Sequence, residues 1–131
     1  MRSINDQCPC GSGFKYKKCC KLFHEGKLPK NALELMKSRY SAYAYEQVGY
    51  IVKTTCKIEE DMQSFKAEIA QFAKYTNFEK LSIKEFIDGE DEAYVTFHAK
   101  LSADGKEISF SEKSRFVKKE GKWCYESGEV F

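Results

Sequence analysis

The pattern that decides the fold class runs Glu92-Ala93-Tyr94-Val95-Thr96-Phe97-His98-Ala99-Lys100-Leu101, where every second side chain is apolar. Successive side chains of a β-strand point to opposite faces of a sheet. This alternation therefore predicts a strand with one buried face and one face turned to solvent. The buried face carries Ala93, Val95, Phe97, Ala99 and Leu101. His98 falls on the other face, and we expect it at the surface.

Turn signals flank this strand and recur further along the chain. Asp88-Gly89 precedes it, Asp104-Gly105 follows it, and Glu120-Gly121 is a third pair. Such pairs favour the tight turns of β-hairpins. A strand is expected from about residue 78 up to the first of these turns, and two more strands are expected near residues 107–118 and 122–127. Together these segments predict an antiparallel meander of four strands.

Helical spacing replaces this alternation in the residues before the meander. Asn31 can cap a helix, with Glu34 three residues on as in a capping box. Apolar residues then recur every three or four positions at Leu33, Met36, Tyr40 and Tyr43, and again at Met62, Phe65, Ile69 and Phe72. A short helix or turn is expected at Tyr50-Ile51-Val52. Helices followed by strands predict an α+β fold, with the helices on one face of a curved sheet.

The first part of the chain differs from the rest in composition. Residues 1–30 carry seven Lys/Arg against two Asp/Glu, whereas residues 31–131 carry fifteen against eighteen. The early residues are also dense in Cys and Gly, and their apolar residues show neither helical spacing nor strand alternation. We therefore expect two units, a small knuckle over residues 1–27 and an α+β domain over residues 28–131.

Composition also limits where the protein is expected to work. The chain has no run of 18 or more apolar residues, so no membrane span is expected. Its first residues lack the apolar region of a secretory signal. We therefore expect a cytoplasmic protein, in which thiols are more often metal ligands or catalytic groups than disulfides.

Four of the six cysteines form two pairs in the segment from Cys8 to Cys20. Zinc accepts four thiolates in a closed tetrahedral shell, and lysines in the segment can offset the resulting charge. The predicted ligands of this Zn²⁺ are Cys8, Cys10, Cys19 and Cys20. A closed shell leaves no position for water, so the zinc would be structural rather than catalytic. A thioredoxin-like redox pair would need Cys-x-x-Cys spacing, which neither pair has.

Two questions about cysteine remain open at this point. His24 can replace Cys20 as the fourth ligand, because zinc knuckles commonly mix Cys and His. Cys56 and Cys124 stand apart from the cluster, and we expect both to be buried structural cysteines.

Polar residues on the inner face of the predicted sheet suggest a second site. Glu112 and Ser114 alternate with apolar residues of the third strand and therefore point inward. The candidate pocket comprises Tyr40, Tyr43, Glu112, Ser114, Trp123 and Tyr125. Glu112 would act there as a base or an anchor. Alternatively, Glu112 is structural and pairs with Arg39 or with tyrosine hydroxyls, since buried polar networks often fix a core without doing chemistry.

A third candidate surface is the Lys-rich loop of the knuckle. Its predicted contact residues are Lys15, Tyr16, Lys17 and Lys18. Basic residues interleaved with aromatics can bind an acidic protein or RNA.

The cysteine segment resembles the SEC-C motif, known from the C-terminal zinc tail of the translocation ATPase SecA. The matching residues are Cys8, Cys10, Gly11, Ser12, Gly13, Tyr16, Lys17, Cys19 and Cys20. The resemblance implies zinc held by the four cysteines, Cys20 included. It also implies a docking module that contacts a chaperone or the ribosome.

The rest of the chain is similar to the YchJ family of small bacterial proteins. The resemblance rests on Arg39-Tyr40-Ser41-Ala42-Tyr43, Glu112-Lys113-Ser114-Arg115-Phe116 and Gly121-Lys122-Trp123-Cys124-Tyr125. It implies an NTF2-like cone of helices against a curved sheet. Some members have a His where this chain has Ser111, and many have a second SEC-C motif after the position of Phe131.

These observations lead to three functional hypotheses. The first is a non-catalytic docking module that binds a protein or the ribosome through the knuckle. The second is an enzyme or small-ligand binder that uses the pocket around Glu112. The third is an RNA- or ribosome-associated factor that uses the Lys-rich loop.

Overall fold

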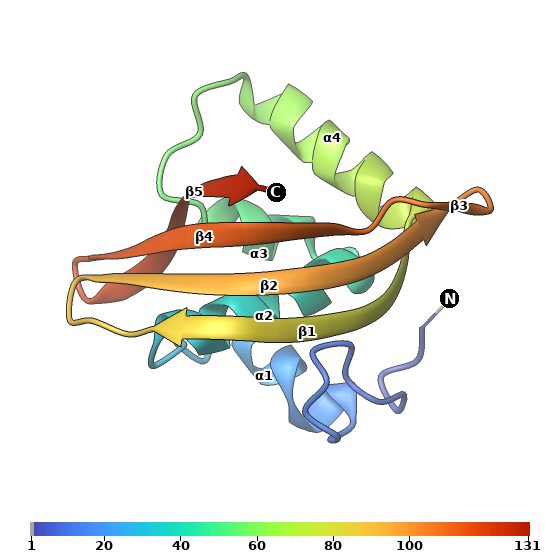
Figure 1. Cartoon of the computed structure of the whole chain (residues 1–131), viewed down its shortest axis with the longest axis horizontal. Helices are drawn as coiled ribbons and strands as arrows, with labels where there is room; N and C mark the ends of the chain where they lie inside the picture. The colour runs from blue at the N-terminus through green and yellow to red at the C-terminus, as the bar shows by residue number, and fades with distance from the viewer. Residues whose placement is uncertain (1) are drawn as a thin grey trace.

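A computed structural model describes residues 2–131 and shows helices packed on an antiparallel sheet, which confirms the α+β class (Figure 1). The helical elements are η1 (Tyr16–Lys18), α1 (Cys20–His24), α2 (Ala32–Ala44), α3 (Val48–Lys53) and α4 (Met62–Tyr75). The strands are β1 (Asn77–Ile87), β2 (Glu92–Ala103), β3 (Lys106–Glu107), β4 (Phe110–Lys119) and β5 (Lys122–Val130). No helix within residues 2–131 has both the length and the apolar character needed to cross a bilayer.

The sheet is the predicted meander, with strand order β1-β2-β4-β5 and the short β3 paired to β2. Two of the predicted hairpin turns have the expected left-handed backbone. At Asp104-Gly105 the φ angles are 54° and 76°, and at Glu120-Gly121 they are 52° and 79°. Two successive residues with positive φ match the twist of the flanking strands, which explains why Gly occupies the second position of both turns.

Helix α2 lies at the centre of the molecule and packs on β1, β2 and β5 as well as on the other helices. Its start is the predicted one, because the Asn31 side chain accepts a hydrogen bond from the Glu34 amide at 2.9 Å. The sequence predicted one apolar face, but every residue of α2 is buried or half-buried. Polar Ser38, Arg39 and Ser41 are therefore buried too. The reason is that the sheet covers one side of α2 and the N-terminal knuckle covers another.

The knuckle, residues 2–27, packs directly against the helical layer. The ring of Tyr16 stacks on Tyr45 with centroids 3.6 Å apart. The His24 ring donates from Nε2 to the Ser38 carbonyl of α2 at 2.8 Å, and the Tyr45 hydroxyl donates to the Ser3 carbonyl at 2.7 Å. In Figure 1 the knuckle, in blue, lies beside β1 and below α2.

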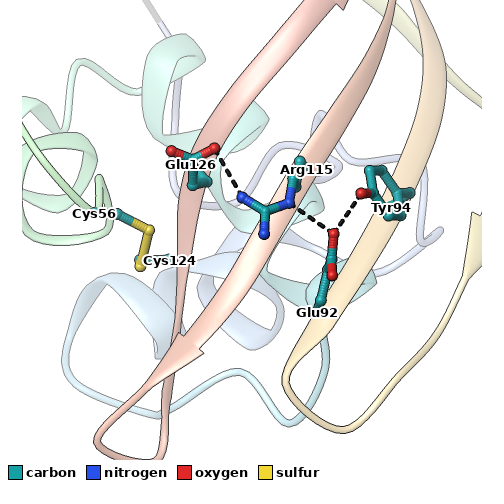
Figure 2. Close-up of polar contacts among 6 residues, drawn as sticks. All are labelled: Cys56, Glu92, Tyr94, Arg115, Cys124 and Glu126. Atoms are coloured by element: carbon teal, nitrogen blue, oxygen red, sulfur yellow. Dashed lines mark hydrogen bonds and ion pairs between the residues drawn. A yellow bond between two sulfur atoms is a disulfide. The ribbon is translucent and has the colours of Figure 1, made fainter.

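Cys56 and Cys124 form a disulfide, so the prediction of two free structural cysteines is wrong (Figure 2). The backbone explains the pairing. The Tyr125 amide donates to the Thr54 carbonyl at 2.8 Å, and the Cys56 amide donates to the Tyr125 carbonyl at 2.9 Å. These bonds hold residues 54–56 beside β5 and leave the two cysteine Cα atoms 5.1 Å apart, within the range that a disulfide spans.

Candidate functional site

The four cysteines of the knuckle converge on one point. The Sγ atoms of Cys8, Cys10, Cys19 and Cys20 all lie within 4.8 Å of one another. The Cys10 and Cys19 sulfurs are 3.7 Å apart. A tetrahedral zinc ion with Zn–S bonds of about 2.3 Å places its sulfurs about 3.8 Å from each other. The cluster therefore has the size that a four-thiolate metal site requires.

Local backbone geometry brings the two cysteine pairs together. The Cys8 amide donates to the Phe14 carbonyl at 2.8 Å and the Gly11 amide to the Cys8 carbonyl at 3.2 Å, which closes the loop after the first pair. Gly11 and Gly13 take φ angles of 85° and 88°, a region that favours glycine. At the second pair, Cys19 leaves helical geometry with φ −130° and ψ −111°. This break lets neighbouring cysteines both face the cluster.

Two hydroxyl groups lie next to the sulfurs. Ser12 Oγ is 3.1 Å from Cys19 Sγ, and Ser41 Oγ of α2 is 3.3 Å from Cys8 Sγ. Hydroxyls so placed can donate to thiolates and orient metal ligands. Hydrogen bonding with Cys10 and Cys8, together with burial, raises the pKa of Cys20 well above its ordinary value. This set of four sulfur donors could hold a metal ion.

His24 does not compete with Cys20 for the metal position. Its Nε2 is held by the Ser38 carbonyl, and its Nδ1 faces the Tyr16 hydroxyl. Since a carbonyl only accepts, Nε2 carries the proton and Nδ1 accepts from Tyr16. Burial lowers the pKa of His24 and favours this neutral form. Both ring nitrogens of His24 therefore form hydrogen bonds with protein groups. Neither nitrogen is free to replace the Cys20 sulfur as a metal ligand.

The predicted contact residues of the Lys-rich loop fall into two groups. Lys15, Lys17 and Lys18 are exposed, and the neighbouring Phe14 is 65% exposed. Tyr16 is only 2% exposed, so its inclusion as a docking residue is wrong. Its ring is needed for the stack on Tyr45, which attaches the knuckle to the rest of the molecule.

A cavity of about 500 Å³ lies between α2, α4 and the inner face of the sheet. Aromatic rings form much of its wall, namely Tyr40, Tyr43, Phe65, Phe72, Phe78, Phe97, Phe110, Phe116 and Tyr125. Val130 and Phe72 are 65% and 39% exposed and therefore lie where the cavity meets solvent. The volume falls within the range of small-molecule sites in proteins.

The polar side chains of the cavity meet around Glu112. Glu112 Oε2 accepts hydrogen bonds from the Ser114 hydroxyl and, at 3.3 Å, from the Tyr125 hydroxyl. A Cβ added at Gly128 would lie 2.3 Å from Glu112 Oε2, so the absence of a side chain there makes room for the carboxylate. Five of the six predicted pocket residues therefore line one cavity: Tyr40, Tyr43, Glu112, Ser114 and Tyr125.

Trp123 is the exception among the predicted pocket residues. It is buried at 6% exposure in the core but does not line the cavity. It pairs with Lys118 near the β4–β5 turn, whereas Glu112 pairs with Val130 at the other end of the same strands. The alternation along the strand predicts on which face of the sheet Trp123 lies. It does not predict how far along the strands Trp123 lies from Glu112.

Arg39 lines the cavity, whereas the sequence indicated it only as an alternative partner of Glu112. Its side chain, 9% exposed, lies with the guanidinium carbon 4.7 Å from the centre of the Tyr125 ring. Nη1 donates to the Thr54 hydroxyl at 2.8 Å, to the Thr55 hydroxyl at 3.2 Å and to a backbone carbonyl. No ion pair within residues 2–131 joins Glu112 to Arg39. The other pairing named for Glu112 is formed, because the Tyr125 hydroxyl donates to Glu112 Oε2.

The outer face of the sheet carries a separate set of polar contacts (Figure 2). Arg115 donates to Glu92 at 2.7 Å and to Glu126 at 3.0 Å. His98 lies on this face as predicted, half-buried, with Nδ1 2.8 Å from the Ser111 hydroxyl. These groups lie on the side of the sheet away from the cavity, so they do not take part in it.

Comparison with known proteins matches both parts of the chain. A family described as "YchJ, middle NTF2-like domain" matches residues 31–128, and the SEC-C motif matches residues 5–22. A UPF0225 protein of Vibrio parahaemolyticus is 36% identical over 127 residues, which cover 92% of this chain and 73% of the relative. A UPF0225 protein of Vibrio vulnificus is 37% identical over 129 residues, with the same coverage.

Two solved structures resemble the whole molecule. A SEC-C motif containing protein from Rhodopseudomonas palustris has 29% identity and a TM-score of 0.77, with 98% of each chain covered. A SEC-C motif containing protein from Psychrobacter arcticus has 27% identity and a TM-score of 0.80, covering 95% of this chain and 82% of the other. Both pair a SEC-C motif with this architecture.

Proposed function

Since the chain belongs to the YchJ family of UPF0225 proteins, which joins a SEC-C motif to an NTF2-like domain, we propose that it is a small-ligand-binding protein with a structural zinc site. The observation that carries the proposal is the cavity of about 500 Å³ with aromatic walls and a few converging polar groups. Protein sites for small molecules commonly combine an apolar lining with a small number of placed polar groups.

Zinc is the metal that we propose for the cysteine cluster. The donor set of four thiolates at tetrahedral spacing supports this choice. When bound, the ion would supply folding free energy to a segment with little apolar surface. Cys8, Cys10, Cys19 and Cys20 would hold it, and the exposed lysines of the loop would offset part of the negative charge.

The anchoring of Glu112 favours binding over catalysis. Its carboxyl group accepts hydrogen bonds from two hydroxyl groups, those of Ser114 and Tyr125. Burial, followed by the charge of Glu112, raises the pKa of Tyr125, so this hydroxyl keeps its proton and remains a donor. The carboxylate is thus fixed as a hydrogen-bond acceptor toward the cavity.

The cavity proposal predicts binding of an uncharged apolar probe. N-phenyl-1-naphthylamine is expected to show enhanced fluorescence with the native chain. Replacing Val130 with tryptophan should weaken this binding about tenfold, since Val130 lines the cavity and is 65% exposed at its mouth. The measurement is a fluorescence titration at constant protein concentration.

The matched control is Ile87→Trp, which adds the same bulk to another exposed strand residue. Ile87 is 45% exposed and does not line the cavity, so probe binding should stay unchanged. Equal affinities for the native chain and the Val130→Trp variant would contradict the proposal.

A second candidate function is docking through the knuckle, and the exposed Phe14 beside three exposed lysines favours it. Exposed aromatic and basic groups together are suited to an acidic protein surface. By family resemblance the partner would be of chaperone or ribosome type. The docking surface that we now propose comprises Phe14, Lys15, Lys17 and Lys18, with Phe14 in place of the buried Tyr16.

Charge reversal at this surface tests the docking proposal. The double variant Lys17→Glu/Lys18→Glu is expected to recover at least tenfold less of its specific partners from lysate. The recovered amounts are quantified by mass spectrometry. The control is Lys118→Glu/Lys119→Glu, an adjacent exposed pair at the end of β4. Unchanged recovery with the first variant would count against the surface. Loss of recovery after nuclease treatment would favour RNA as the partner.

A further inference from the structure

Three charged side chains line the cavity, namely Arg39, Glu112 and Glu68, and Glu68 is exposed on α4. Arg39 and Glu112 carry opposite charges and do not pair with each other. The ring of Tyr125 lies beside both of them. Its face is 4.7 Å from the guanidinium carbon of Arg39, and its hydroxyl donates to Glu112 Oε2 at 3.3 Å. Both Arg39 and Glu112 line the cavity. The polar end of the site therefore presents a cation and an anion side by side.

Each of the two groups has hydrogen-bonding capacity left over. A guanidinium has five N–H donors, and the hydrogen bonds of Arg39 to residues 2–131 all leave from Nη1. The N–H groups on Nε and Nη2 thus have no protein acceptor in the described chain. Both hydrogen bonds to Glu112 reach Oε2, so Oε1 has no protein donor there.

Burial makes the free donors of Arg39 significant. The side chain is 9% exposed, and no carboxylate of residues 2–131 forms an ion pair with it. Among residues 2–131 the fully buried side-chain N and O atoms without a partner are the Tyr40 hydroxyl and Trp123 Nε1, so Nε and Nη2 of Arg39 keep some contact with solvent. A charged group with little solvation is still costly to bury, and a hydrogen bond to it lowers that cost. Burial also lowers the pKa of Arg39, which shows that its charge is poorly solvated. A ligand that accepts hydrogen bonds from Arg39 would remove this cost.

The charge balance restricts the ligand head group. A carboxylate would pair with Arg39 but would be repelled by Glu112, and an ammonium group would have the opposite problem. A neutral head with an acceptor next to a donor satisfies both residues. A carboxamide has this arrangement, because its oxygen accepts and its N–H groups donate.

We propose that the cavity binds a neutral aromatic molecule with a carboxamide-type head, whose oxygen accepts from Arg39 and whose N–H donates to Glu112 Oε1. The proposal rests on the proposed function, since it assumes that the cavity binds a small ligand. The aromatic walls, including Tyr43, Phe97 and Phe110, contact the ring system of the ligand. Aromatic pairs add to the stabilisation gained from burial alone.

A matched series of naphthalenes tests the head group with the full-length chain. The four probes are naphthalene, 2-naphthamide, 2-naphthoate and 2-naphthylmethylamine, titrated by NMR chemical-shift perturbation. The amide is expected to bind about tenfold more tightly than naphthalene, a difference of about 1.4 kcal/mol, because it forms two hydrogen bonds that naphthalene cannot form. The carboxylate and the amine should both bind more weakly than the amide.

The variant Glu112→Gln distinguishes a specific head-group site from general apolar binding. It removes the negative charge but keeps the shape and leaves Arg39 in place. The preference should then reverse, with 2-naphthoate binding more tightly than 2-naphthamide, because no carboxylate at position 112 repels it. Glu129→Gln, at an exposed residue of β5 outside the cavity lining, is the control and should leave the order unchanged.

A second variant, Gly128→Ala, tests the position of the carboxylate without changing charge. The new Cβ would lie 2.3 Å from Glu112 Oε2, so the carboxylate must move. The advantage of the amide over naphthalene should fall at least threefold, while naphthalene itself still binds.

The outcomes separate this inference from the proposed function. If the native chain binds 2-naphthoate or the amine most tightly, or all four probes equally, the head-group assignment is overturned and the ligand cavity stands. If no probe binds, naphthalene included, the ligand-binding function fails and the inference fails with it. An unchanged order in Glu112→Gln also overturns the assignment.

Discussion

Replacing Cys10 with serine is expected to abolish metal binding and to unfold the knuckle. Zinc content should fall from about one equivalent per chain to nearly none, because three thiolates hold the ion far more weakly than four. The binding free energy of structural zinc is about 10–16 kcal/mol in zinc-finger peptides at pH 7. Residues 2–27 bury too little apolar surface to replace it. Elemental analysis and amide hydrogen exchange of residues 7–25 measure the two effects.

The variant Ser12→Ala provides the graded control. Ser12 Oγ lies 3.1 Å from Cys19 Sγ. Its loss should weaken metal affinity by about 10- to 100-fold, as expected for a group that orients a ligand, and leave the knuckle folded. If the native chain, purified without chelator, holds less than about half an equivalent of zinc, the metal proposal is wrong.

Loss of the Cys56–Cys124 disulfide is expected to have the second largest effect. The bridge spans a sequence separation of 68 residues. Closing a loop of that length stabilises the folded state by about 4 kcal/mol in the chain-entropy model. The double variant Cys56→Ser/Cys124→Ser should therefore unfold at clearly lower urea concentration than the oxidised native chain.

A phosphine reductant provides the internal comparison for this prediction. The reductant should lower the urea midpoint of the native chain to that of the double variant and leave the variant unchanged. A native midpoint that is insensitive to the reductant would mean that the bridge is not formed. Thiol alkylation in intact cells would further show whether the two cysteines are oxidised there, since a reducing compartment disfavours disulfides.

Local patterns explain which parts of the fold and the site were predictable. The alternation around Val95, the turns at Gly105 and Gly121, and the Asn31 cap each depend on residues a few positions apart. The cysteine cluster is similar, because its ligands lie within one short segment whose backbone closes on itself. Periodicity also placed Glu112 and Ser114 on the inner face of the sheet.

Contacts between distant segments were not predictable in this way. The disulfide joins Cys56 to Cys124, and nothing in the sequence around either residue marks the other as its partner. The burial of Ser38 and Ser41 was not predictable because helical periodicity assigns one buried face, whereas α2 is covered on several sides. The burial of Tyr16 likewise depends on Tyr45, which lies beyond the end of α2.

Helix α2 has a further consequence, because it contributes to both sites of the molecule. Ser41 contacts the Cys8 sulfur, and Arg39 lines the cavity two positions earlier, so the two side chains leave the helix on different sides. If the proposed metal and the proposed ligand both bind, a ligand that moves Ser41 relative to Cys8 would change metal affinity, and metal would change ligand affinity by the same factor. Such a coupling free energy would be measurable from either side.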